Sequence, residues 1–136
     1  MKKFTILLLV FFSLFSCKKT LEEKARDIVV NAMTSGKWSI TRFTTDGTNI
    51  TSDFTGYSFQ FFENETVDAI KNNSVEANGS WKGDAANMSI SANFINVSEP
   101  LSLINGTWSI TNNSWTFVEA KQTSGAQVKT LRLDKL

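Results

Sequence analysis

The chain has 136 residues, with 14 Lys or Arg, 13 Asp or Glu, no His and a formal net charge of +1 at pH 7. This length suits one domain with a single modest core, and the near-neutral charge argues against nucleic-acid binding. The absence of histidine excludes Ser–His–Asp and Cys–His catalysis and removes the commonest metal ligand, while the single cysteine, Cys17, excludes an intramolecular disulfide.

An apolar run from Phe4 to Phe15 follows two lysines and ends in Ser16-Cys17. It is too short to span a bilayer as a helix, which takes ~20 residues, and it fits the hydrophobic region of a signal peptide. The ending Leu14-Phe15-Ser16-Cys17 resembles a bacterial lipoprotein signal. We therefore expect removal of residues 1–16 and lipidation of the Cys17 thiol, with acyl chains such as palmitate. The alternatives are an ordinary secretory signal or a buried N-terminal strand.

The lipid on Cys17 would hold the mature protein at the bacterial cell envelope. Lys18 follows the cysteine in place of the aspartate that is the usual inner-membrane retention signal. By resemblance to known lipoprotein sorting, this favours the outer membrane, on its periplasmic or its surface face.

Residues 20–34 are expected to form a helix. Thr20 and Glu23 have the spacing of a capping box, and Ser35-Gly36 ends the segment. One apolar stripe runs along it, at Leu21, Ala25, Ile28, Val29, Ala32 and Met33. The helix could space the next domain from the membrane, close one of its ends, or pack on its outside; the apolar stripe favours docking.

From Lys37 onward, apolar residues alternate with polar ones, as in Phe59 and Phe61 or Leu131 and Leu133. Eight strands are expected, at 37–44, 56–62, 66–71, 75–82, 87–94, 101–110, 114–120 and 127–134. Asp46-Gly47, Asn78-Gly79 and Asn105-Gly106 indicate turns or bulges. The predicted fold is all-β: an eight-stranded antiparallel up-and-down barrel over residues 36–136, after a segment (17–35) with the lipidated cysteine and the helix. Its interior is either filled by side chains or holds one small ligand.

A Gly-x-Trp pattern occurs three times, ending at Trp38, Trp81 and Trp108. Glycine lets the backbone bend where a strand begins or bulges, and each tryptophan buries a large area. These residues are expected either to fill the core or to line a ligand cavity or sugar-binding surface. The candidate ligand-binding residues are Trp38, Tyr57, Phe59, Phe61, Trp81, Trp108 and Trp115.

Together, these motifs resemble the lipocalin-like domain of small bacterial lipoproteins over roughly residues 36–136. The resemblance rests on Gly36-Lys37-Trp38, on the segment Thr51–Phe61 with its Gly-Tyr-x-Phe-x-Phe end, on Gly79-Ser80-Trp81 and on Leu131-Arg132-Leu133-Asp134-Lys135. It implies that a basic residue of the last strand packs over the first-strand tryptophan. The expected barrel-closing pair is therefore Arg132 on Trp38, in a cation–π contact.

The function expected from these features is binding of a small apolar or amphipathic ligand by a membrane-anchored monomer. The alternatives are a filled barrel with a structural or interaction role, and carbohydrate contact through exposed aromatic residues. Carboxylate pairs such as Glu63 and Glu65 lie in polar turn segments and are interpreted as solvated. We therefore expect no enzyme activity, no cofactor, no metal and no nucleic-acid partner.

Overall fold

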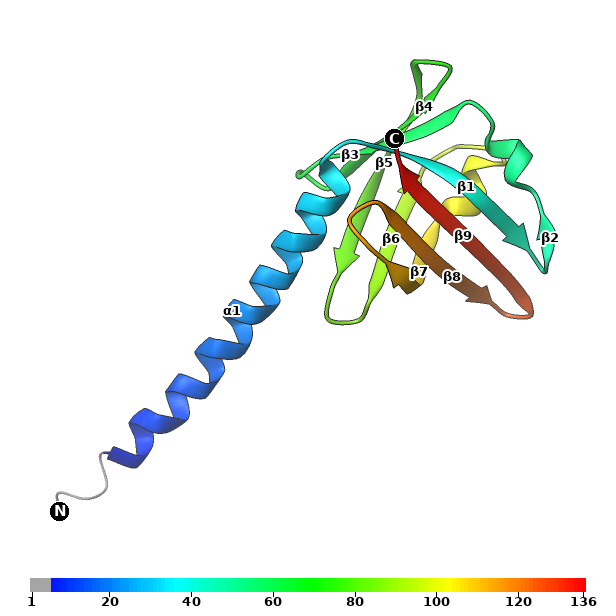
Figure 1. Ribbon diagram of the computed structural model, residues 1–136. Helices are drawn as coiled ribbons and strands as arrows, with labels where there is room; N and C mark the ends of the chain where they lie inside the picture. Colours follow the sequence, from blue (N-terminus) through cyan, green and yellow to red (C-terminus); the bar gives the residue numbers. More distant parts are fainter. Residues whose placement is uncertain (1–5) are drawn as a thin grey trace.

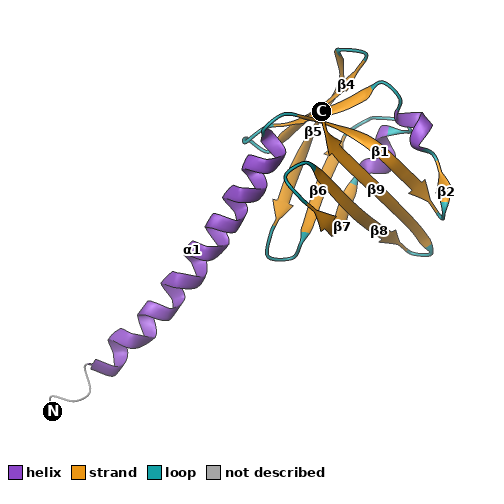
Figure 2. Ribbon diagram, in the orientation of Figure 1, coloured by secondary structure: helices purple, strands orange, loops and turns teal. Residues whose placement is uncertain are grey.

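The computed structural model describes the backbone of residues 6–136 and the side chains of residues 19–136. One long helix, α1 (Ile6–Thr34), leads into a β-barrel (Figures 1 and 2). The predicted helix ends at Thr34 as expected, but its backbone continues toward the N-terminus as far as Ile6. The predicted lipidation site, Cys17, lies outside the residues whose side chains are described.

Eight strands form a closed antiparallel up-and-down barrel, as the sequence predicts. Consecutive strands are neighbours from β3 to β9, and β1 closes the ring by pairing with both β3 and β9. The strands are β1 (Lys37–Thr45), β3 (Tyr57–Phe61), β4 (Thr66–Lys71), β5 (Ser74–Asp84), β6 (Ser89–Phe94), β7 (Gly106–Asn113), β8 (Phe117–Ser124) and β9 (Gln127–Lys135). A two-residue strand, β2 (Thr48–Asn49), pairs only with the end of β1.

The seam between β1 and β3 is short, because only the first two residues of β1 pair with β3. Beyond them, the 3-10 helix η1 (Thr51–Phe54) covers the gap. The Phe43 amide donates to Thr51 Oγ1 at 2.8 Å, and the Ile50 amide donates to the Phe43 carbonyl at 2.9 Å. The Phe54 ring packs on the Phe43 ring with centroids 4.8 Å apart. One side-chain hydrogen bond, one backbone hydrogen bond and ring packing thus hold η1 on β1 where the ladder is missing.

Two predicted strands differ from the structure. The segment 101–110 begins with the 3-10 helix η2 (Leu101–Ile104), and β7 starts only at Gly106. The segment 114–120 was expected to be a strand that includes the candidate ligand-binding residue Trp115, but β8 starts at Phe117 and buries Val118 and Ala120. Val118 and Ala120 pair with Leu133 and Leu131 of β9, which sets the inward face of β8. Trp115 lies in the turn before it and is 58% exposed.

The last turns of α1 dock on the barrel end where β1 begins. We call this the proximal end; it also carries the β3–β4 turn (62–65), the β5–β6 turn (85–88) and the β7–β8 turn (114–116). Met33 is 3% exposed, and Val29 packs so closely on Gly83 that a Cβ there would lie 2.7 Å from its Cγ1. Arg26 forms an exposed ion pair with Glu65 at 3.1 Å. The expected docking is therefore confirmed for the C-terminal turns, whereas Leu21 and Ile28 remain largely exposed.

Candidate functional site

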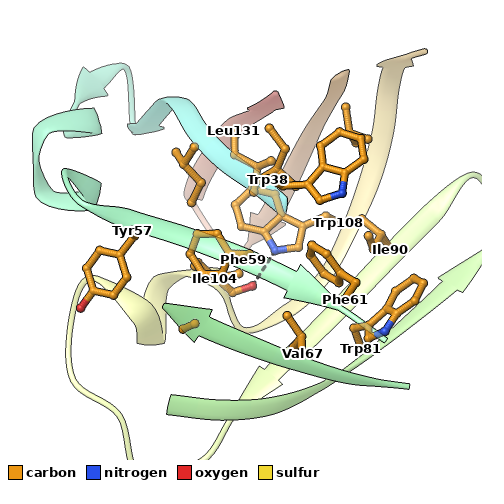
Figure 3. Close-up of a cluster of buried hydrophobic side chains, with 14 of the residues drawn as sticks. Trp38, Tyr57, Phe59, Phe61, Val67, Trp81, Ile90, Ile104, Trp108 and Leu131 are labelled. Carbon is orange, nitrogen blue, oxygen red and sulfur yellow. Dashed lines mark hydrogen bonds between the residues drawn. The ribbon is translucent and has the colours of Figure 1, made fainter. Parts of the chain in front are cut away.

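Six of the seven predicted ligand-binding residues lie in the core. They range from 0% exposed for Trp38 to 7% for Tyr57. The buried six are Trp38, Tyr57, Phe59, Phe61, Trp81 and Trp108 (Figure 3). Their rings pack on one another and on neighbouring phenylalanines, with centroids 5.2 Å apart for Phe61 and Trp81 and 6.4 Å apart for Phe59 and Phe94. Trp115 is separate from this cluster, in the β7–β8 turn.

Each tryptophan of the Gly-x-Trp repeat donates its indole N–H to a backbone carbonyl. Trp38 donates to Met33 at 2.9 Å, Trp81 to Phe62 at 2.9 Å and Trp108 to Ile104 at 2.7 Å. A buried indole N–H needs such an acceptor. The three indoles therefore tie segments outside the strands to the barrel, and none has a free donor for a ligand.

Little space remains between these side chains. The cavity inside the barrel is about 30 Å³, lined by residues such as Ile40, Phe59 and Leu133. Ligand pockets are ~300–1,000 Å³, whereas a cavity of this size has room for only about two waters, at ~10–15 Å³ each. The interior is therefore filled by side chains, which is one of the two arrangements that the sequence left open.

The basic residue over Trp38 is Lys135, which corrects the expected pairing with Arg132. Lys135 pairs with Trp38 across the β1–β9 ladder, and its Nζ lies 4.9 Å from the Trp38 ring centroid. The same Nζ donates to the Ala32 carbonyl at 3.0 Å, so it also holds the end of α1. Leu131 and Leu133 point inward, so Arg132 points outward. It lies 4.3 Å over the Phe117 ring.

A second lysine, Lys129, lies inside the opposite end of the barrel, which we call the distal end. It is 7% exposed, and its Nζ donates to the Leu103 carbonyl at 2.8 Å. The Trp108 ring centroid is 5.5 Å away. Burial lowers the pKa of Lys129, because it disfavours the charged form. Sequence reasoning missed this residue, although Lys129, Leu131, Leu133 and Lys135 share one face of a strand by period two.

The hydroxyl of Tyr57 also titrates abnormally. Burial, together with a hydrogen bond to the Glu76 carboxylate, raises the pKa of Tyr57 to about 12. Lys71 Nζ lies 4.8 Å from the ring centroid. These residues border a polar surface hollow of about 400 Å³ at the distal end.

An apolar pocket of about 160 Å³ lies at the proximal end, between α1 and the barrel. The helix contributes Ile28, Val29, Ala32 and Met33, and the barrel contributes Trp38, Ile90, Ile110, Asn113, Ser114, Trp115 and Val118. The buried Trp38 and the exposed Trp115 therefore border the same pocket. Among residues 19–136, no group of three or more Asp, Glu, His or Cys side chains is placed to hold a metal ion.

No family model matches the sequence. No curated protein matches it either. Among solved structures, the fold is similar to that of a DUF4847 family protein from Bacteroides vulgatus, with a TM-score of 0.55 and 14% sequence identity. The match covers 78% of this chain and 96% of the other, and it supports the barrel fold alone. Within the part of the chain searched, residues 19–136, no helix has the length and apolarity needed to cross a bilayer.

Proposed function

We propose that this protein is a lipid-anchored bacterial envelope protein whose filled barrel acts as a non-enzymatic interaction module. The observation that carries the proposal is the barrel interior, which retains a cavity of only about 30 Å³. Its aromatic residues are engaged with one another and with backbone carbonyls. Such a barrel offers its surface and its turns to a partner, not its interior.

The anchor in this proposal is Cys17, at the end of the lipoprotein-like signal. Outer-membrane residence and a monomeric state belong to the same proposal. Cys17→Ala is expected to leave the chain unlipidated. Carbonate-washed membranes should then retain less of the variant than of the wild type, and equal retention would contradict the anchor.

Native mass spectrometry of the mature protein purified in detergent tests the filled barrel. The expected mass is that of the polypeptide with its lipid modification and nothing more. A further component that binds in a one-to-one ratio, is released on unfolding and still binds when Ala32→Leu fills the proximal pocket would contradict a filled interior. A panel of fatty acids and retinoids should also leave the emission of the buried tryptophans unchanged.

The second candidate function is binding of a small apolar ligand in the proximal pocket. Its volume of about 160 Å³ favours this possibility, because an apolar cavity of ~150 Å³ binds benzene. Ala32→Leu would fill the pocket from the helix side. Loss of a co-purifying ligand in that variant would support this candidate. Carbohydrate contact has less support, because Trp115 is the single aromatic among the exposed large hydrophobic residues of 19–136.

A further inference from the structure

Large apolar side chains are exposed unevenly over the molecule. Five of them lie at the proximal end. One is the C-terminal Leu136, at 74% exposed beside Lys37, and the other four are Leu21 at 67%, Ile28 at 56%, Met88 at 49% and Trp115 at 58% exposed. We call these four residues the proximal patch. At the distal end, Val75 and Ile95 are exposed singly, as scattered apolar residues often are.

The four residues lie near one another at the proximal end. Ile28 and Trp115 line the same pocket between α1 and the β7–β8 turn. Leu21 lies seven residues before Ile28, which is two helical turns and therefore the same flank of α1. The Met88 carbonyl accepts a hydrogen bond from the Ile110 amide at 2.8 Å, and Ile110 lines that pocket too.

The flank of α1 that carries Leu21 and Ile28 is mostly apolar and includes one lysine. By the helical period, the flank carries Leu21, Lys24, Ala25, Ile28, Asn31 and Ala32. None of the six is acidic; Asp27 borders the flank beside Lys24 and Asn31, and Glu22 lines a surface hollow together with Leu21. A lysine among apolar residues suits the interface of an anionic bilayer.

The position of the anchor supports the same occupant. Helix α1 joins the barrel at the proximal end (Figure 1), so a lipid on Cys17 makes this end the one nearest to the bilayer. The helix between Cys17 and Thr34 is only about 25 Å long at 1.5 Å per residue. Tryptophan also prefers the membrane–water interface, where its ring is buried and its N–H stays wet.

We propose that the proximal patch rests on the surface of the lipid bilayer that anchors the chain. The inference rests on the proposed anchoring through Cys17. In this arrangement α1 lies along the membrane surface, with Leu21 and Ile28 toward the lipid. Trp115 and Met88 then bring two of the three proximal turns of the barrel into contact with it.

The test uses Trp115 as its own reporter, because the other three tryptophans are buried. Mature lipoprotein is reconstituted into vesicles of phosphatidylethanolamine and phosphatidylglycerol, with and without brominated acyl chains. The Trp115 signal is the difference between the wild type and Trp115→Phe. Brominated lipid is expected to remove most of this signal, and the emission in unbrominated vesicles should be blue-shifted relative to detergent solution.

A matched control places an exposed tryptophan at the other end of the barrel. Ile95→Trp in the Trp115→Phe background should show no loss of the added signal, because Ile95 lies at the distal end and is 73% exposed. Equal quenching at both positions would contradict an oriented contact.

The remaining outcomes separate the contact from the anchor. A lipidated Cys17 peptide found together with an unquenched Trp115 would overturn the contact and leave the anchor intact. A Cys17 peptide without lipid would overturn both. If Trp115 becomes inaccessible to acrylamide in detergent as the protein concentration rises, the occupant is a second copy of the chain, which also overturns the proposal.

Discussion

Among residues 19–136, Lys129 is the single charged side chain that is buried. The Leu103 carbonyl is its hydrogen-bond acceptor, and burial lowers its pKa below the unfolded value of about 10.4. Between those two pKa values the unfolded chain binds more protons than the folded one, so the free energy of unfolding should rise with pH there. Lys129→Met should abolish this rise, as urea unfolding at a series of alkaline pH values would show.

The same substitution should change stability at neutral pH by less than ~2 kcal/mol. Removing a buried charge is favourable, whereas the Leu103 carbonyl loses its donor at a cost of about 1–3 kcal/mol. Lys121→Met is the matched control, since Lys121 is exposed on β8. A pH slope that persists in Lys129→Met, or that disappears in Lys121→Met, would contradict the assignment to Lys129.

The basic residue over Trp38 shows what sequence reasoning at the residue scale can and cannot supply. The expectation of a basic residue from the last strand was correct in kind, but the residue was Lys135 and not Arg132. The alternation along β9 already indicates Lys135, because Lys135 lies on the same face of the strand as the inward-pointing Leu131 and Leu133. Its hydrogen bond to the Ala32 carbonyl depends on where α1 docks, which local sequence does not show.

At the scale of elements, the contact between α1 and β5 depends on the missing side chain of Gly83. A methyl group there would meet Val29 Cγ1 at 2.7 Å, and a β-branched residue in a helix has little rotamer freedom to move away. Gly83→Ala is therefore expected to displace the docked turns of α1. Hydrogen exchange of amides 26–34 should accelerate, while strands β7 to β9 keep their protection.

Val29→Ala offers a compensating change for that clash. The double variant Gly83→Ala/Val29→Ala should recover part of the lost protection, giving a coupling of about 0.5–3 kcal/mol, as expected for residues in contact. Strictly additive effects would show that the Gly83 position does not limit docking.

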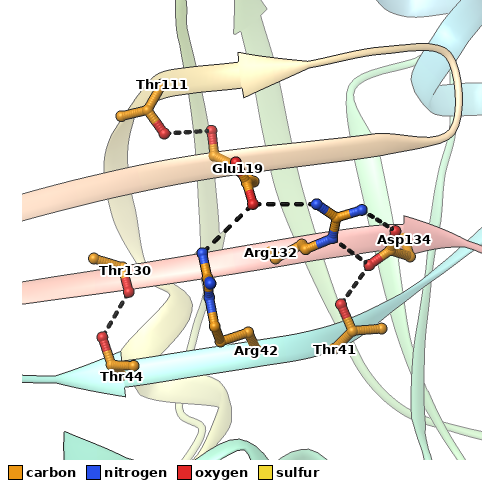
Figure 4. Close-up of polar contacts among 8 residues, drawn as sticks. All are labelled: Thr41, Arg42, Thr44, Thr111, Glu119, Thr130, Arg132 and Asp134. Atoms are coloured by element: carbon orange, nitrogen blue, oxygen red, sulfur yellow. Dashed lines mark hydrogen bonds and ion pairs between the residues drawn. The ribbon is translucent and has the colours of Figure 1, made fainter. Parts of the chain in front are cut away.

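The outer face of β1, β8 and β9 carries a network of charges (Figure 4). The Arg132 guanidinium donates twice to the Asp134 carboxylate, at 2.8 and 2.9 Å, and once to Glu119 at 3.1 Å. Hydrogen bonding to Arg132, aided by Thr41, holds the pKa of Asp134 below its usual range. The associated stability is present above the unfolded pKa of about 3.9 and is lost as pH falls through the folded value.

Asp134→Asn should therefore flatten the acid limb of the stability curve. Urea midpoints between neutral pH and about pH 2 would measure this, with the wild type losing more stability than the variant as unfolded-state carboxylates protonate. The effect should be small and reduced by salt, because both side chains are partly exposed. Asp53→Asn, in the exposed part of η1, is the comparison that should leave the acid limb unchanged.

The strand predictions succeeded where alternation is unambiguous and failed where it is not. β9 has alternating leucines, and both were correctly placed inside. Around β8, the apolar residues Trp115, Phe117 and Val118 are nearly consecutive, so alternation alone does not say which of them point inward. The pairing of β8 with β9 turns Val118 inward. Residues 101–104 contain Leu-Ser-Leu-Ile, which reads as strand but forms η2 and buries Leu101 and Ile104 against the core.

At the scale of the whole molecule, the closed barrel was predictable and its filled interior was not. Period-two patterning identifies which side chains face inward, and eight such strands can close a ring. It does not say how the rings interlock, because packing depends on rotamers and on segments outside the strands. Phe54 of η1 and Ile104 of η2 both contribute to the core. The volume of the interior cavity therefore depends on how all these segments pack together and does not follow from the strand pattern alone.

Phe59→Ala tests directly whether this barrel is filled. Phe59 is 2% exposed, borders the small interior cavity and packs between Tyr57 and Phe94. Its truncation should cost about 3–5 kcal/mol and open a cavity. An apolar cavity of ~150 Å³ stays dry and binds benzene, so benzene should raise the Tm of the variant by more than that of the wild type, whose response can come from the proximal pocket alone. Phe62→Ala, at a half-buried position beyond the end of β3, is the control that should gain no benzene response. If benzene raised the Tm of the wild type and of Phe59→Ala by the same amount, the prediction of a filled barrel interior would be wrong.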